Sequence, residues 1–308
     1  MSIKGKAAIA GVYEHPLRWA PHKTQYQIMA ESARGALDDA GLKLKDVDGL
    51  FTSGVGGMGI IALAEHLNLN PDYLDSNSIG GSSFVSHTAH AAAAIAAGYC
   101  TTALILYGST WSSDRFAIGT GGGGGSDPPD YFESCYGPTT VGAYALVAQR
   151  HMHEFGTTSG QLAEIAVTMR KHASLNPLAK FRDPITVDDV LSSREVSSPL
   201  HLLDCCMISD GGGAIVVTSA ERARDLKKKP VHILGAAESA AHTSAGMRDV
   251  LNAAAKQSGP TALARAGVAH KDINMAMIYD SFTITVLVTL ESLGFCQKGE
   301  GGAFIQNG

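Results

Sequence analysis

Hydrophobic positions along this chain form two patterns, helical spacing and short continuous runs. Ile28, Ala33 and Leu37 recur at helical spacing, which predicts a helix over Gln25–Ala40 that ends at Gly41. Short apolar runs predict strands at residues 6–12, 46–52, 101–108 and 211–219, and a second helix is expected at residues 57–67. Because strands and helices alternate, the sequence predicts an α/β fold with a mostly parallel sheet.

Residues 76–109 have the most unusual pattern of the chain. They predict a short strand, a tight Gly-Gly turn, a helix over about residues 82–97 and a buried strand. Ser82 or Ser83 can cap this helix, and Gly98 follows its end. Its second half is nearly all alanine, so neighbours can approach closely on every side, and we expect it in the middle of the protein. Its free N–H groups favour an anionic or polarised ligand atom, although a packed core helix without a ligand has the same pattern.

Residues 110–200 have a different, mainly helical pattern. Helices are expected at residues 138–155 and Ser159–Leu175, followed by a short helix capped by Thr186. The glycine run at residues 120–126 matches G-x-G-x-x-G, but it neither follows a strand nor opens a helix, so it does not indicate a dinucleotide site. His151 and His153 are two residues apart on a helix, where they face different sides and cannot share a metal ion.

Composition narrows the class of protein. The 308 residues are 45% hydrophobic and 17% charged with a net charge of −5, which is typical of a globular α/β protein. Basic runs that would indicate nucleic acid and apolar runs of membrane-spanning length are both missing from the sequence. Five scattered cysteines, none in a C-x-x-C pair, argue against structural zinc and favour a reducing, cytoplasmic location. They are Cys100, Cys135, Cys205, Cys206 and Cys296.

The chain contains an internal repeat. ALDDAGLKLKDVDGLF begins at Ala36 and ALARAGVAHKDINMAM begins at Ala262, 226 residues later. Each copy predicts a helix that ends in Ala-Gly, a loop with Lys-Asp and an apolar strand, and residues 231–237 lie where a second copy of the first strand is expected. At this offset residue 308 corresponds to residue 82. The second half therefore looks incomplete, and either an intact relative has roughly 70 to 90 further residues or a partner supplies that surface.

The repeat, the helical insertion and the small-residue helix together resemble the thiolase superfamily. The resemblance is closest to the sterol carrier protein 2 type of thiolase and covers essentially the whole chain. It is carried by SIGGSSFVSHTAHAAAAIAAG, RHMHEFGTT, LHLLDCCMISDGGGAIVVTS and YDSFTITVLVTLESLGFCQKGEG. It implies an α/β, thiolase-like fold of two related βαβ-rich halves with a helical loop insertion, the second half being incomplete at the C-terminus. The implied parts are residues 1–110 with 205–228, the loop insertion 111–204, and residues 229–308.

The resemblance also identifies what this chain lacks. In the family a nucleophilic cysteine begins the small-residue helix, whereas this chain has Gly81, which cannot accept an acyl group. Ser82 or Ser83 is a conceivable substitute, but serine needs an adjacent base and the sequence shows none. Cys135 could alternatively reach in from the loop segment. Cys296 precedes the loops that carry the family's second histidine and its acid/base cysteine, and is expected to be structural.

A second family motif, His-Asp-Cys-Phe, reads Tyr-Asp-Ser-Phe in this chain. The family's histidine helps to stabilise the thioester oxygen, and Tyr279 and Asp280 occupy the first two positions. A tyrosine hydroxyl can donate a hydrogen bond to a carbonyl oxygen or act as an acid or base. The structural alternative is that Tyr279 only ends a strand.

Loss of the cysteine together with this tyrosine is similar to steroid side-chain aldolases of the lipid-transfer-protein type. That resemblance implies a lipid-metabolism enzyme that cleaves a β-hydroxyacyl-CoA by retro-aldol chemistry beside a zinc-ribbon/OB-fold acyl-CoA-binding partner. Coenzyme A would be part of the substrate, with no bound cofactor and no metal. The alternatives are an acetyl-CoA acetyltransferase-like thiolase with a non-standard nucleophile, and an inactive acyl-CoA-binding subunit. The resemblance further implies a homodimer, expected through the strand at residues 102–108, and an acyl pocket lined by residues 110–200.

Overall fold

The computed structural model describes residues 2–53, 55, 58–115, 139–241 and 249–306. The chain divides into two compact units, and each is described by itself. Unit 1 comprises Met1–Phe116, Ser209–Glu238 and Thr261–Val268, and unit 2 comprises Ala117–Ile208, Ser239–Pro260 and Ala269–Gly308. The division into two related halves and an insertion, drawn from the repeat, stays a prediction.

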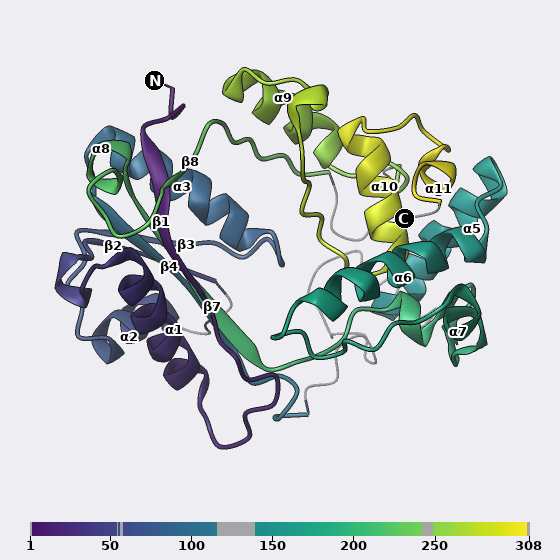
Figure 1. Ribbon diagram of the computed structural model, residues 1–308, viewed down its shortest axis with the longest axis horizontal. Helices are drawn as coiled ribbons and strands as arrows, with labels where there is room; N and C mark the ends of the chain where they lie inside the picture. The colour runs from purple at the N-terminus through teal and green to yellow at the C-terminus, as the bar shows by residue number, and fades with distance from the viewer. Residues whose placement is uncertain (1, 54, 56–57, 116–138, 242–248, 307–308) are drawn as a thin grey trace. The chain divides into compact units, whose positions relative to one another are not determined.

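Unit 1 is built on a six-stranded sheet in the order β3-β2-β4-β7-β1-β8 (Figure 1). The strands are β1 (Ala7–Glu14), β2 (Gly49–Thr52), β3 (Tyr73–Ser76), β4 (Thr102–Ser109), β7 (Gly211–Ser219) and β8 (Val231–His232). β2 runs parallel to β3 and β4, whereas β7 runs antiparallel to β4 and β1. The expected mostly parallel sheet is therefore wrong. The chain re-enters the sheet beside the point where β4 ends, since Gly211 pairs with Ser109, and it can only run back along β4.

Helices cover both faces of this sheet. α1 (Gln25–Ala40) and α2 (Gly59–His66) lie on one side and α3 (Ser83–Ala97) lies on the other (Figure 1). Successive residues of β4 alternate between them, because Leu104 and Leu106 pack in the α1 core and Ala103 and Ile105 in the α3 core. The continuous apolar run of β4 is thus explained by burial on both faces.

The sheet covers one side of α3. Ala91, Ala92 and Ala94 are buried in the core that α3 shares with the sheet, while Val85 is 75% exposed. The expectation of a helix in the middle of the protein, with neighbours on every side, stays a prediction.

The predicted repeat is visible in the local structure. α1 ends at Gly41 with a φ of +75°, and α9 (Ala255–Ala266) is followed by Gly267 with a φ of +69°. A short 3₁₀ turn follows each helix, at Leu44–Asp46 and at His270–Asp272. In each turn the aspartate carboxylate accepts the backbone N–H of the residue three positions earlier at 2.8 Å.

The strands of the second copy do not follow the first. Residues 231–237 contribute only the two residues of β8, and residues 273–280 form no strand in the described structure. A strand needs a neighbour that accepts its backbone hydrogen bonds, and no described strand lies beside residues 273–280.

The strand expected to form the dimer, β4, lies inside the sheet rather than at its edge. β4 is hydrogen-bonded to β2 on one side and to β7 on the other, so its backbone is fully used. β3 has only β2 as a neighbour and forms one edge of the sheet.

Unit 2 is mainly helical. Its elements are α5 (Thr140–Phe155), α6 (Ser159–Leu175), α7 (Val187–Ser192), β5 (Glu195–Ser197), β6 (Leu200–His201), α10 (Thr283–Leu293) and α11 (Gly301–Phe304). Thr158 and Thr186 cap α6 and α7 through reciprocal bonds with the residue three positions on. The glycine run at residues 120–126 and Cys135 lie outside the described residues. Across the residues described, every helix is too short or too polar to cross a membrane.

Candidate active site

The first candidate site is the turn that opens α3 in unit 1. Gly80 has a φ of +73°, a backbone conformation that favours glycine, and Ser82 occupies the N-cap position. The Ser83 hydroxyl accepts the N–H of Ile79 at 2.9 Å and donates to the carbonyl of Gly80 at 2.7 Å. Ser83 therefore closes the turn, and no described base receives a hydrogen bond from Ser82 or Ser83.

No described thiol of unit 1 lies at this turn. Gly81 carries no side chain, and the described cysteine of unit 1, Cys100, follows the opposite end of α3. Cys100 is buried, and burial, with Asp48 and Asp72 nearby, raises its thiol pKa to about 12. Cys100 thus fits packing rather than nucleophilic chemistry.

A polar cluster beneath the turn was missed by the sequence reasoning. His90 lies between two carboxylates, with Nδ1 at 2.6 Å from Asp75 and Nε2 at 3.0 Å from Glu238. The Ser86 hydroxyl donates to the same Glu238 oxygen at 2.9 Å. Two histidines three residues apart, His87 and His90, on a helix otherwise rich in alanine were the available signal, since such polar residues are costly to bury without a purpose.

A second candidate site is the Tyr-Asp-Ser-Phe motif in unit 2. Its last two residues are anchored: the Ser281 carbonyl accepts the N–H of Cys206 at 3.0 Å, and the Phe282 ring packs 4.3 Å from Tyr144. Tyr279 is 57% exposed and lies in a segment that forms no strand in the described structure. It therefore does not end a strand, and its catalytic role stays a prediction.

Asp280 lines a cavity of about 570 Å³ within unit 2. Its wall is largely apolar and comes from α6 and the segments around β6, including Ile165, Met169, Phe181, Ile185, Leu202 and Met207. Among its lining residues, the guanidinium of Arg170 and the ammonium of Lys180 lie 5.5 and 5.8 Å from the Phe181 ring centre, and Asp204 and Asp280 add carboxylates. Such a cavity suits a ligand with a large apolar body.

The cysteines beside this cavity are held as neutral thiols. Burial is the main cause that raises the pKa of Cys205 to about 11, and burial together with the charge of Asp280 raises the pKa of Cys206. A protonated thiol is a poor nucleophile, so neither residue is set up to accept an acyl group near neutral pH.

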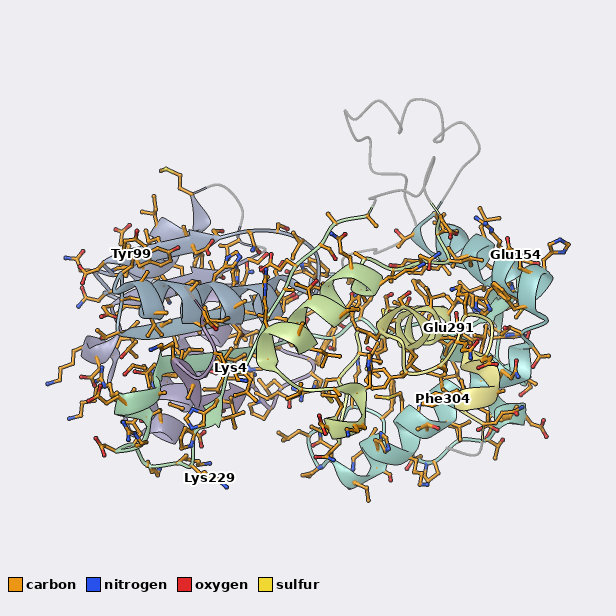
Figure 2. The ribbon with its side chains drawn as sticks, turned by 90° about the horizontal axis from the view of Figure 1, so that it is seen from above. Lys4, Tyr99, Glu154, Lys229, Glu291 and Phe304 are labelled. Atoms are coloured by element: carbon orange, nitrogen blue, oxygen red, sulfur yellow. The ribbon has the colours of Figure 1, made fainter. Side chains whose placement is uncertain are left out.

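A buried ionic network holds the end of α10 in unit 2, where Figure 2 shows Glu291 among the helices. The Glu291 carboxylate receives His151 Nε2 at 3.1 Å, Lys298 Nζ at 2.8 Å, and the backbone N–H groups of Gly299 and Gly301 at 3.0 Å each. Although burial acts in the opposite direction, these donors lower the Glu291 pKa to about 2. His151 is buried in this network and His153 is exposed, so the two histidines face different sides as predicted.

The fold and the site define a class of enzyme: a thiolase-like α/β protein whose small-residue helix starts without a thiol. Residues 235–308 match the Thiolase C-terminal domain-like family. The chain is 36% identical to a steroid side-chain-cleaving aldolase of Thermomonospora curvata, over 99% of this chain and 82% of that protein. It is 35% identical to the 17-hydroxy-3-oxo-4-pregnene-20-carboxyl-CoA lyase of Mycobacterium tuberculosis, over 99% of this chain and 83% of that protein.

A solved structure described as an Ltp2-ChsH2(DUF35) aldolase superposes with a TM-score of 0.91 at 35% identity, covering 99% of this chain and 81% of that one. The chain therefore belongs to the thiolase superfamily, in the family of sterol carrier protein 2 thiolase-like proteins that includes these aldolases. The predicted family and fold, and the prediction of a thiolase-superfamily enzyme, are confirmed.

Replacing Glu291 with glutamine is expected to destabilise unit 2. The partly exposed Lys298 and the buried His151 would lose their anionic partner, which costs on the order of 3 kcal/mol in the free energy of unfolding at neutral pH. Because the folded-state pKa is lowered to about 2, the wild type gains this stability above the unfolded pKa near 4.5 and loses it as the pH falls toward 2. Denaturant unfolding between pH 7 and pH 3 measures both effects.

The matched control is Glu154→Gln, which removes an exposed carboxylate paired with Arg150 on α5. Its stability should stay close to that of the wild type. Equal stability of the wild type and Glu291→Gln at pH 7 would show that the network contributes nothing.

Proposed function

We propose that this protein cleaves a carbon–carbon bond of a β-hydroxyacyl-CoA by retro-aldol chemistry, without a covalent acyl-enzyme. The observation that carries the proposal is Gly81, which stands where the family has its acyl-accepting cysteine. The protonated state of Cys100, Cys205 and Cys206 supports the same conclusion. The two relatives named as an aldolase and a lyase support the reaction class.

The reaction requires a base and an oxyanion donor. The base removes the β-hydroxyl proton, the electron pair of the O–H bond forms a carbonyl, and the adjacent carbon–carbon bond breaks toward the thioester. The resulting thioester enolate is stabilised by hydrogen-bond donors and is then protonated to release an acyl-CoA. For Tyr279, with Asp280 beside it, we propose the proton transfer or the oxyanion donation. The N–H groups at the start of α3 are a separate candidate for the oxyanion donor.

A thiolase with a serine nucleophile is the alternative within the same superfamily. The geometry of Ser83 argues against it, because its hydroxyl proton already goes to the Gly80 carbonyl. Ser82 is more exposed and remains the residue that this alternative would use. A further alternative, an inactive acyl-CoA-binding subunit, would bind substrate with no turnover in the presence of its partner.

We further propose that the unit 2 cavity holds the bulky apolar part of the acyl group. Its apolar wall and its size of about 570 Å³ suit a polycyclic or long acyl chain better than an acetyl group. The steroid substrates in the names of the two relatives agree with this choice. Coenzyme A would then enter as part of the substrate.

The proposal includes two protein partners. The solved relative is described with a ChsH2(DUF35) component, which supports a zinc-ribbon/OB-fold acyl-CoA-binding partner for this chain. For a homodimer we propose the β3 edge, where Leu74 is exposed on the strand and Tyr99 stacks on Tyr73 beside it. The scattered free cysteines favour a cytoplasmic location.

Replacing Tyr279 with phenylalanine is expected to lower kcat about 100-fold or more, because one acid–base or oxyanion group is lost, while KM changes little. Cleavage of a panel of β-hydroxyacyl- and β-ketoacyl-CoAs, assayed with the partner protein, measures this. Tyr26→Phe, which alters a half-buried tyrosine of α1 beside His66, is the control. Equal activity of Tyr279→Phe and the wild type would remove the assignment. Mass spectrometry after incubation with acyl-CoA should show no adduct, and an adduct on Ser82 would favour the thiolase.

Filling the cavity should change substrate choice. Met169→Trp is expected to raise KM for bulky acyl-CoAs at least about tenfold and to leave short acyl-CoAs unchanged, since the larger ring occupies the apolar space. Leu146→Trp, on an exposed position of α5 that does not line the cavity, is the control. A parallel loss for short and long substrates would place the acyl group elsewhere.

A charge on the β3 edge should disrupt the dimer. Leu74→Glu is expected to convert the dimer to monomer, because the carboxylate would be buried without a partner. Size-exclusion chromatography with light scattering measures the mass of the wild type and of Leu74→Glu. Val231→Glu, at the exposed opposite edge of the sheet, should leave the dimer intact. A monomeric wild type would contradict the dimer proposal.

A further inference from the structure

Beneath the turn that opens α3, His87 is fully buried among aromatic rings. The centres of the Phe51 and Phe84 rings each lie 6.0 Å from that of His87. His87 is four residues after Ser83, so it lies on the same face of α3, one turn further from the helix start. Its Nε2 is 3.4 Å from the backbone nitrogen of Asn77, in the segment between β3 and the glycine turn. His87 therefore connects α3 to the segment that precedes its first turn.

The protonation of His87 follows from this contact. The Asn77 N–H donates to Nε2, so in a neutral ring the remaining proton is on Nδ1. Desolvation is the main cause that lowers the pKa of His87, with the charge of His90 adding to it and Asp75 and Glu238 opposing it. The neutral ring therefore offers Nδ1–H as a hydrogen-bond donor.

Two buried polar atoms of this cluster have no hydrogen-bond partner among the described residues. Asn77 Nδ2 donates to Ser86 Oγ at 3.0 Å, which fixes the amide orientation, because the Ser86 hydroxyl already donates to Glu238. Asn77 Oδ1 and His87 Nδ1 are both sealed from solvent, and neither has a hydrogen-bond partner among the described residues. One is an acceptor and the other a donor, on two residues already in contact.

The chemistry of the two atoms restricts what can bind there. Leaving both unpaired would cost about 1–3 kcal/mol for each group, a large fraction of a domain's stability. Both atoms are closed to bulk solvent, so a partner must be small, and one partner that serves both must accept from Nδ1–H and donate to Oδ1. Water meets these conditions, and a buried water with such partners is a regular part of protein interiors.

We propose that a buried water molecule binds between His87 Nδ1 and Asn77 Oδ1, and that His87 with this water is a positioning device for the turn at residues 77–83. The water would link the start of α3 to the segment that carries Gly80 and Gly81, so that the N–H groups of the turn keep their direction. The role of the turn in holding the enolate rests on the proposed function, whereas the water site itself does not.

The wild-type protein tests the site directly. A high-resolution crystal structure should show water density within hydrogen-bond distance of both atoms, and ¹⁵N NMR of the imidazole should show the Nδ1–H tautomer at neutral pH. Missing density or an Nε2–H tautomer would overturn the proposal. Neither measurement depends on turnover, so they decide this inference even if the wild type fails to cleave any β-hydroxyacyl-CoA and the proposed function falls.

Variants test the positioning role. His87→Phe keeps an aromatic ring but cannot hold the water, and kcat is expected to fall about tenfold or more with KM nearly unchanged, because the turn is misplaced. His87→Gln can accept from Asn77 and still donate to the water, so it should recover most of the lost kcat. Recovery by glutamine is a result that a role in packing alone does not give.

The control is Thr88→Val on the same helix, whose hydroxyl donates to the Phe84 carbonyl at 2.9 Å. It should keep wild-type kcat. Should His87→Phe fail to fold, Asn77→Ala removes the acceptor instead and should lose both the water and kcat in the same way. Wild-type kcat in His87→Phe or in Asn77→Ala would refute the positioning role.

Discussion

Unit 1 depends on the packing of a helix whose second half is nearly all alanine against a strand buried on both faces. Ala91, Ala92 and Ala94 of α3 let the helix approach the face of β4 that carries Ala103 and Ile105. The opposite face of β4 is fixed by α1 through Leu104 and Leu106. With both faces of β4 occupied, α3 has little freedom to shift, and its first turn is held near the carboxyl ends of β2 and β4. In open α/β sheets that end is where ligands bind.

Much of the local structure could be predicted because its causes are local. Helix α1 begins at a Thr24 capping box and ends at a left-handed Gly41, and both signals are written in adjacent residues. The order of the strands was not predictable in the same way. Whether β7 runs along or against β4 depends on where the chain re-enters the sheet after about a hundred residues, and no residue near Gly211 encodes that choice. The repeat likewise identified the turn at His270–Asp272, but strand formation after it depends on a neighbouring strand rather than on sequence.

The candidate site residues also differ in how far the sequence alone identifies them. That Gly81 cannot serve as an acyl acceptor is readable from one residue type in a known position. The polar cluster of Asp75, Asn77, Ser86, His90 and Glu238 was not readable, because its members come from three segments that only the fold brings together. Tyr279 was identified from the sequence only in part. Its position was identified by the motif, whereas the lack of a strand over residues 273–280 in the described structure could not be read from the sequence.

The described thiols, like the turn without a cysteine, disfavour a covalent acyl-enzyme. A replacement nucleophile would need a lowered pKa, from a nearby cation or a helix start. The opposite holds here, since burial is the largest cause that raises the pKa of Cys100 to about 12 and those of Cys205 and Cys296 to about 11. Nearby carboxylates such as Asp48, Asp204 and Glu291 act in the same direction. The electrostatic environment thus disfavours thiolate formation at each of these positions, and carbon–carbon bond cleavage by proton transfer is the chemistry that these surroundings leave open.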